Sequence, residues 1–130
     1  MDAPVRVLIV DDDVDFRAML RWQLSKADNL SVIGDAADGY EALERVEQLD
    51  PEVAVVDLMM PGMDGFELID RLLEEHPHVV PVAYSAMANE HARDQLQAIG
   101  VEMLTKSGNA ERLVEVITRL APPREEHATP

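Results

Sequence analysis

Four aspartates follow directly on an apolar run near the N-terminus. The segment Val7 to Val10 is wholly apolar, and Asp11, Asp12, Asp13 and Asp15 come next. Carboxylates gathered within a few ångströms repel by about 1 kcal/mol per pair in water and by about 4 kcal/mol at an effective dielectric of about 20. A cation that joins them relieves the repulsion, and Mg²⁺ prefers oxygen ligands. We therefore expect Asp11 and Asp12 to bind Mg²⁺, whereas Asp13 and Asp15 favour the positive end of a helix that begins there.

Three further polar residues end apolar runs far along the chain, namely Asp57, Ser85 and Lys106. A carboxylate can form an acyl phosphate when the charge on the transferring group is neutralised and attack is in line. Asp57, alone at the end of its run, is the best candidate for that nucleophile. Lys106 would then bind one phosphoryl oxygen and Mg²⁺ a second, while Ser85 would donate a hydrogen bond to a third.

The elements that must bring these residues together follow from the hydrophobic pattern, because short apolar runs alternate with segments of helical spacing. The predicted strands are Val5 to Val10, Leu30 to Gly34, Val53 to Val56, Val79 to Tyr84 and Val101 to Thr105. The helical segments are marked by Met19, Leu20 and Leu24, by Ala42, Leu43 and Val46, by Leu68, Ile69, Leu72 and Leu73, by Ala92, Leu96 and Ile99, and by Leu113, Val114, Ile117 and Leu120. The sequence thus predicts an α/β fold of the (βα)5 type.

The order of the strands follows from their polarity. Strands joined by helices lie parallel, and the inner strands of a parallel sheet are covered on both faces. The first, third and fourth runs are continuously apolar, whereas Ser31 and Gly34 in the second run and Glu102 in the fifth suit sheet edges. This pattern predicts a doubly wound five-stranded parallel sheet of order 2-1-3-4-5, with a crevice between strands one and three. Right-handed crossovers then place helices one and five on one face and helices two to four on the other.

Local signals mark the helix ends. Asp38 with Glu41, and Asp64 with Glu67, have the spacing of an N-cap followed by an acid in the first turn. Asn109 is expected to cap the last helix, and Gly100 to end the fourth.

Composition narrows the class of protein. The 130 residues are 47% hydrophobic, which suits one globular domain with a real core. We expect that domain to span residues 1–120, with Ala121 to Pro130 as a disordered tail or the start of a linker. The absence of cysteine, of a signal segment and of a long apolar run predicts a cytoplasmic protein without membrane contact. A formal charge of −15 argues against direct contact with nucleic acid.

Four motifs resemble the receiver domain of bacterial two-component response regulators over about Val5 to Leu120. They are VLIVDDD, VVDLMMPGMDGFEL, VAYSA and MLTK, which contain Asp11 and Asp12, Asp57, Ser85 and Lys106. The resemblance implies a flavodoxin-like fold, Asp57 as phosphoacceptor, and Mg²⁺ held by Asp11, Asp12, Asp57 and the backbone carbonyl of Met59. It also implies a sensor histidine kinase or phosphotransfer protein as donor. The surface of the fourth helix, fifth strand and fifth helix would change on phosphorylation and act on an effector protein, a missing output domain or a second copy in a homodimer.

The sequence departs from that family in three places. Met103 stands where an aromatic residue is common, three positions before Lys106. Ser107 follows Lys106 where proline is frequent, and a cis peptide bond there would cost about 3 to 4 kcal/mol. Met59 and Met87, each two positions beyond a site residue, cannot orient an attacking water by hydrogen bonding. The last feature predicts a slowly hydrolysing phosphoryl-Asp57.

Two other classes of function fit part of the pattern. A haloacid-dehalogenase-like phosphatase would use Asp11 as nucleophile, but it needs a further acidic pair after the lysine, where only Glu111 and Glu115 occur, inside a helical segment. A pure binding module would take no phosphoryl group. A flavin phosphate would be repelled by the DDDVD segment after the first strand. We therefore expect a phosphoacceptor signalling domain rather than an enzyme.

Overall fold

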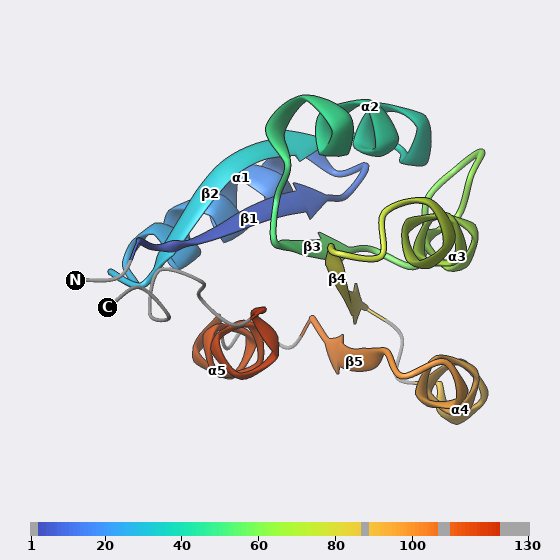
Figure 1. Cartoon of the computed structure of the whole chain (residues 1–130). Coiled ribbons are helices and arrows are strands. Elements are labelled where there is room, and N and C mark those ends of the chain that lie inside the picture. The colour runs from blue at the N-terminus through green and yellow to red at the C-terminus, as the bar shows by residue number, and fades with distance from the viewer. Residues whose placement is uncertain (1–2, 87–88, 107–109, 123–130) are drawn as a thin grey trace, which may run out of the picture.

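The computed structural model describes residues 3–86, 89–106 and 110–122, and in these ranges five strands alternate with five helices (Figure 1). The strands are β1 Val5–Val10, β2 Leu30–Ala36, β3 Val53–Val56, β4 Val80–Ser85 and β5 Glu102–Thr105. The helices are α1 Val14–Ser25, α2 Gly39–Leu49, α3 Gly65–Glu75, α4 Glu90–Ala98 and α5 Ala110–Leu120. The predicted (βα)5 alternation is confirmed.

All strand pairs are parallel, and the order β2-β1-β3-β4-β5 is the predicted one. The inner strand β3 is buried throughout, while β2 and β5 form the edges and include half-buried positions. The strand β2 is two residues longer than expected, because Asp35 and Ala36 pair with Ile9 and Val10 after a shift of register. Ser85 proves to be the last residue of β4 rather than the residue after it.

The N-termini of four helices are capped by side chains that accept backbone N–H bonds. Asp13 caps α1, Asp38 caps α2, Asp64 caps α3 and Asn89 caps α4. Glu41 does not bond back to the cap residue; its carboxylate accepts from Ala37 N at 3.0 Å instead.

The C-terminal signal of α4 also behaves as predicted. Gly100 follows that helix with a φ of +78°, a conformation that glycine adopts without steric cost. The predicted cap Asn109 lies outside the described residues.

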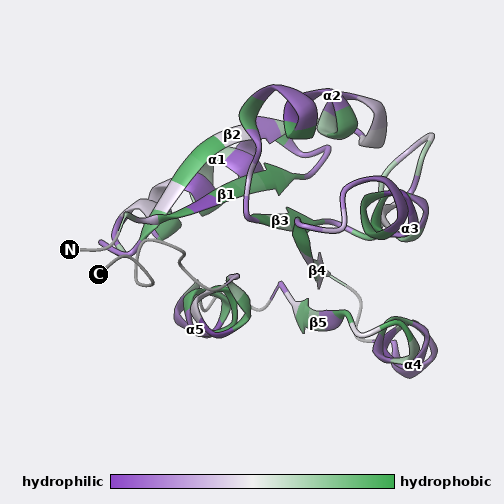
Figure 2. Cartoon of the chain, in the orientation of Figure 1, coloured by the Kyte–Doolittle hydropathy of each residue, from purple (hydrophilic) through white to green (hydrophobic). Residues whose placement is uncertain are grey.

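Two apolar clusters pack on opposite faces of the sheet, and Figure 2 shows the apolar sides of the helices turned toward the strands. One cluster includes Leu20, Leu24, Leu113, Val116 and Ile117 of α1 and α5. The other includes Ala42, Val46, Leu68, Ile69, Leu72, Ala92 and Leu96 of α2, α3 and α4. The predicted division of the helices between the two faces is therefore confirmed.

Two apolar residues of the predicted helical pattern lie outside these clusters. Met19 is 43% exposed and Ile99 is 44% exposed. Met19 precedes Leu20, which points at the sheet, so it lies about 100° around the helix from the buried side. Ile99 is the C-cap of α4, beyond the last helical turn.

The described part of the chain extends slightly past residue 120, where the domain was expected to end. Ala121, the first residue of the predicted tail, packs against the cluster of α1 and α5, and residues from 123 on are not described. In the described ranges no helix has both the length and the apolarity needed to cross a membrane.

Candidate functional site

The carboxyl ends of four strands deliver the predicted site residues to one edge of the sheet. Val10 of β1 pairs with Val56 of β3, so the residues that follow them, Asp11 and Asp57, lie side by side. The backbone fixes this junction, because Asp57 N donates to Val10 O at 2.9 Å. On the other side, Lys106 N donates to Ser85 O at 2.8 Å, which joins the ends of β5 and β4.

Asp11, Asp12 and Asp57 form an acidic triad with one ligand atom from each within 4.8 Å of the others. Asp11 is 2% exposed and Asp57 is 5% exposed, whereas Asp12 is open to solvent. Backbone donors hold both buried carboxylates: Asp13 N donates to Asp11 Oδ1 at 2.8 Å, and Met59 N donates to Asp57 Oδ1 at 3.2 Å. The two buried acids are thus fixed in direction, while Asp12 faces the water from which a cation would arrive.

Lys106 supplies the positive charge at the triad. Its Nζ atom lies 2.5 Å from Asp11 Oδ2 and 3.4 Å from Asp57 Oδ2. The lysine side chain is 14% exposed. Since a buried charge without a partner is strongly unfavourable, Lys106 offsets part of the cost of placing two carboxylates below the surface.

The environment of Asp57 favours its neutral form. Burial raises the pKa of the Asp57 carboxyl above its ordinary value, the Met59 N–H lowers it, and the negative charge of Asp11 raises it further. Lys106 opposes the rise, through its charge and its hydrogen bond, without cancelling it. The ionised form of Asp57 is therefore less favoured in the folded protein than it would be in water.

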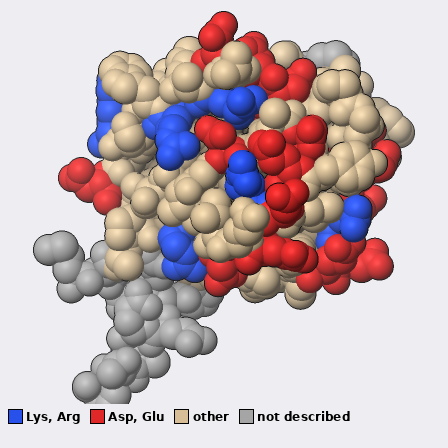
Figure 3. All heavy atoms as spheres, turned by 90° about the horizontal axis from the view of Figure 1, so that it is seen from above, with Lys and Arg blue, Asp and Glu red and all other residues tan. Residues whose placement is uncertain are grey.

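The triad has the chemistry of a divalent-cation site. It offers hard oxygen atoms from three residues at mutually close range, with one residue open to solvent. Mg²⁺ is bound in proteins by one or two carboxylates together with waters and phosphate oxygens, so this donor set fits it. Figure 3 shows that acidic side chains gather on one face of the molecule with single basic residues among them, in keeping with the overall negative charge.

Two neighbours of the site were missed by sequence reasoning. Arg17 Nη1 donates to the backbone carbonyl of Asp11 at 2.7 Å, and its Nε lies 3.8 Å from Asp35 Oδ1. The ring of Phe16 lies under the Lys106 ammonium, with 4.2 Å from Nζ to the ring centroid. Both residues lie in the first turns of α1. Their types and spacing are those of an ordinary amphipathic helix, so the sequence did not indicate that they contact the site.

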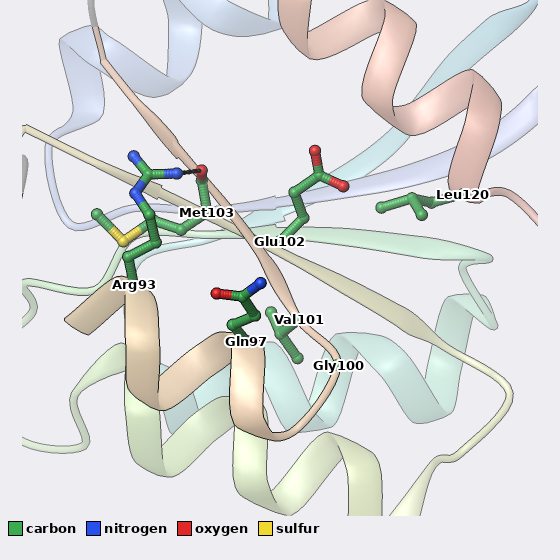
Figure 4. Close-up of a pocket in the computed structure, with 7 residues that line it drawn as sticks. All are labelled: Arg93, Gln97, Gly100, Val101, Glu102, Met103 and Leu120. Atoms are coloured by element: carbon green, nitrogen blue, oxygen red, sulfur yellow. Dashed lines mark hydrogen bonds between the residues drawn. The ribbon is translucent and has the colours of Figure 1, made fainter. Parts of the chain in front are cut away.

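The residues that depart from the family pattern have separate environments. Met103 is buried at 2% exposure, and Arg93 Nη1 donates to its backbone carbonyl at 3.0 Å (Figure 4). Met59 is 57% exposed and lines a pocket of about 160 Å³ together with Ser85. Met87 and the Lys106–Ser107 peptide bond fall outside the described residues.

A hollow lies at the α4, β5 and α5 side of the molecule, next to Met103. Its volume is about 370 Å³, and it is lined by Arg93 and Gln97 of α4, Glu102 of β5 and Leu120 of α5, with Arg93 and Leu120 at opposite sides (Figure 4). Glu102 accepts from Arg119 Nη2 at 2.9 Å, which ties β5 to α5. This surface includes residues of β5, the strand that Lys106 follows.

The doubly wound sheet and the acidic triad define a small α/β domain with a candidate divalent-cation site, and comparison with known families assigns it. The model of the response regulator receiver domain matches residues 7–118. The chain belongs to this family. The recognition made from the motifs is therefore confirmed.

Two of the curated relatives that match are enzymes of the same kind. The chain is 42% identical over 118 residues to a protein-glutamate methylesterase/protein-glutamine glutaminase of Myxococcus xanthus, covering 88% of this chain and 34% of that protein. A similar enzyme of Rhizobium etli is 36% identical over 101 residues, which is 78% of this chain and 29% of that protein. The chain thus spans about a third of the length of these curated relatives.

Two solved structures show the same fold at higher coverage. The signal receiver domain of NarL from Mycobacterium tuberculosis superposes with a TM-score of 0.86 at 29% identity, over 95% of this chain and 100% of that one. The response regulator domain of Thermotoga maritima CheB superposes with a TM-score of 0.80 at 28% identity, over 92% and 99%.

Proposed function

We propose that this domain accepts a phosphoryl group on Asp57 in a Mg²⁺-dependent reaction and signals through the α4, β5 and α5 surface. One observation carries the proposal. The buried Asp57 carboxylate lies within 3.4 Å of the Lys106 ammonium and beside two further aspartates. Membership of the receiver family supports the same role.

The transfer forms one bond and breaks another. A carboxylate oxygen of Asp57 attacks phosphorus in line, and the bond from phosphorus to the leaving oxygen breaks, with the electron pair staying on that oxygen. With acetyl phosphate the leaving group is acetate. Lys106 holds its ammonium against the charge on the phosphoryl oxygens, and Ser85 donates a hydrogen bond to one of them.

The acids of the site prepare it for the metal. Asp11, Asp12, Asp57 and the backbone carbonyl of Met59 would hold Mg²⁺, and bound Mg²⁺ would neutralise charge on the transferring group. Asp11 and Asp57 are oriented beforehand by the N–H groups of Asp13 and Met59. The directions of the two buried carboxylates are therefore set before the ion binds.

Membership of the receiver family supports a choice of donor and output for this domain. A sensor histidine kinase or a phosphotransfer protein would supply the phosphoryl group in a bacterial cytoplasm. The output would go to an effector protein, to a domain that this chain does not contain, or to a second copy in a phosphorylation-dependent homodimer. The methylesterase relatives, of which the chain spans about a third, make such an effector domain one candidate. Direct contact with nucleic acid is disfavoured by the charge of −15.

The phosphatase alternative is less well supported. Its nucleophile would be Asp11, whose Oδ2 lies 2.5 Å from Lys106 Nζ and is held more closely by the lysine than Asp57 Oδ2, at 3.4 Å. The acids that would have to complete such a site, Glu111 and Glu115, lie on the exposed side of α5 rather than at a strand end. Apart from self-catalysed transfer and slow autodephosphorylation, the domain has no enzymatic role in this proposal.

Intact mass spectrometry with acetyl phosphate separates the alternatives. We expect the mass of one phosphoryl group to appear with Mg²⁺ and to vanish with EDTA or in Asp57→Asn. Asp13→Asn is the matched control, because Asp13 caps α1 without belonging to the triad. A mass gain that survives Asp57→Asn but is lost in Asp11→Asn would support the phosphatase. No gain in any variant would support a pure binding module.

A further inference from the structure

We propose that Phe16 is a positioning residue that holds the Lys106 ammonium at the acidic triad through a cation–π contact. The inference rests on the function proposed above, since it concerns the transfer to Asp57. The Lys106 Nζ atom lies 4.2 Å from the centroid of the Phe16 ring. A cation within about 6 Å of a ring centroid is attracted by the negative face of the ring.

The ring gives the ammonium a third contact beside the two acids. Asp11 Oδ2 lies 2.5 Å and Asp57 Oδ2 3.4 Å from Nζ, and both oxygens belong to the triad. Lysine is a point charge on a flexible four-carbon stem, so two carboxylates alone do not fix where the charge sits. The Phe16 face limits the stem to positions from which the ammonium reaches Asp57. Because the lysine is only 14% exposed, water weakens the contact little.

Phe16 is itself held from two sides. Its N–H donates to the N-cap carboxylate of Asp13 at 3.2 Å, so the residue sits in the first turn of α1. Its ring packs against the ring of Tyr84, with 5.9 Å between centroids and 40° between planes. Tyr84 is 4% exposed and directly precedes Ser85 in β4. The ring that guides Lys106 is therefore supported by the helix cap of α1 and by the strand that ends in Ser85.

The same helix contains a second contact of this kind, which serves as a matched control. Lys26 Nζ lies 3.7 Å from the ring centroid of Trp22. Trp22 is 61% exposed and lies nearly two helical turns beyond Phe16, toward the opposite end of α1 from the triad. Removing the Trp22 ring eliminates a cation–π contact without touching the site.

The test measures the rate at which acetyl phosphate phosphorylates the full chain. Phe16→Leu keeps an apolar side chain and removes the aromatic face. We expect the rate at saturating Mg²⁺ to fall between about 2-fold and about 30-fold, which spans the strength of such contacts. The Mg²⁺ concentration at half-maximal rate should stay within about twofold, because the substitution leaves the acids in place. Trp22→Leu should retain the wild-type rate.

Two further measurements separate positioning from a general loss of packing. Phe16 replaced by phenylalanines with one, two and three fluorines keeps its shape while its face becomes steadily less negative, so the rate should fall in the same order. In a Lys106→Gln background, Phe16→Leu should cause no additional loss. A flat fluorine series, or an equal loss in the Lys106→Gln background, would overturn the proposal.

Failure of the proposed function would be visible separately. If the wild-type chain takes no phosphoryl group, the phosphoacceptor role is wrong. The contact is then tested by a double-mutant cycle of urea unfolding for Phe16→Leu and Lys106→Gln without metal. A coupling free energy of zero between the two substitutions would overturn the assignment of Phe16. A clear coupling would support the contact between Phe16 and Lys106.

Discussion

Lys106 donates a hydrogen bond to Asp11 at 2.5 Å across 95 positions of sequence. The same ammonium lies 3.4 Å from Asp57, so one cation stands between two buried carboxylates. In the metal-free protein this arrangement leaves an excess of negative charge at the carboxyl end of the sheet. Stability, metal binding and phosphoryl transfer are therefore linked through the same few atoms.

Removing the lysine charge should weaken the fold. Lys106→Gln leaves Asp11 and Asp57 without their cation, and we expect the free energy of unfolding without metal to fall by about 3 kcal/mol. This is the lower end of the range for breaking a buried ion pair, because Lys106 retains some exposure. Urea unfolding with EDTA measures the change. Lys26→Gln, which alters an exposed lysine, should shift stability by less than about 0.5 kcal/mol. Equal effects of the two substitutions would contradict the account.

Removing a carboxylate should have the opposite effect. Asp57→Asn relieves repulsion with Asp11 and retains an oxygen for the Met59 N–H, so we expect a higher thermal midpoint without metal. Mg²⁺ binding should become weaker, because one ligand is lost. Thermal melts with EDTA and with Mg²⁺ measure both effects, and Asp70→Asn on the exposed side of α3 provides the control. An unchanged or lower metal-free midpoint in Asp57→Asn would count against a repulsive triad.

The difference between wild type and Asp57→Asn should depend on pH. The pKa of Asp57 is raised in the folded protein, chiefly by burial, so the folded state binds the proton more tightly than the unfolded state. The stabilising effect of that proton is complete below the ordinary aspartate pKa of about 4, and it is lost as pH rises through the folded pKa. The free energy of unfolding of Asp57→Asn should therefore exceed that of the wild type most at neutral pH, and this difference should shrink as the pH falls. Urea unfolding of both proteins with EDTA over this range provides the measurement, and a gap that widens in acid would refute it.

Gly65 should tolerate no side chain. It begins α3 directly behind the strand end that carries Asp57, and a Cβ there would clash with the Asp57 carbonyl oxygen and come within 2.6 Å of Leu58 Cα. These are backbone atoms that cannot step aside, so we expect Gly65→Ala to cost about 2 kcal/mol or more. Gly62, with a φ of +77° and no atom near its missing Cβ, is the comparison, and Gly62→Ala should cost about 1 to 2 kcal/mol from backbone strain alone. Urea unfolding of both variants measures the two losses of stability. A smaller loss in Gly65→Ala than in Gly62→Ala would contradict the prediction.

The phosphorylated state should be long-lived. Met59 is exposed beside Ser85 and has no group that can orient a water for attack on phosphorus. We expect phosphoryl-Asp57 to persist for minutes or longer in Mg²⁺. Met59→Gln, which introduces an amide at similar length, should shorten the lifetime, whereas Met19→Gln on the exposed side of α1 should not. Mass spectrometry after removal of the donor measures the lifetime. Decay of the wild-type acyl phosphate within seconds would reject this prediction.

The fold could be predicted because local apolar patterns mark the strands and helices, and because helical connections fix the relative direction of the strands. The all-apolar segment Val53–Val56 could only be an inner strand of a parallel sheet, and Glu102 in a short run indicated an edge. Strands joined by helices share one direction, so Asp11, Asp57 and Lys106 had to meet at one edge of the sheet.

The contacts of individual side chains could not be predicted in this way. Phe16 and Arg17 lie in an ordinary helical pattern, and only the rotation of α1 against β1 places one under Lys106 and the other on the Asp11 carbonyl. The extra length of β2 depends on a shift of register that the sequence of β2 does not predict. Such features depend on how packed elements settle against each other rather than on residue type and spacing.

The most direct test of the account is to map the modified residue in the wild-type chain. The protein would be treated with acetyl phosphate and Mg²⁺, reduced with borohydride to convert an aspartyl phosphate into homoserine, and digested for peptide sequencing by mass spectrometry. The account predicts one modified residue, Asp57, and none when EDTA replaces Mg²⁺. Modification at Asp11, or an unmodified Asp57 under conditions that saturate the metal site, would contradict it.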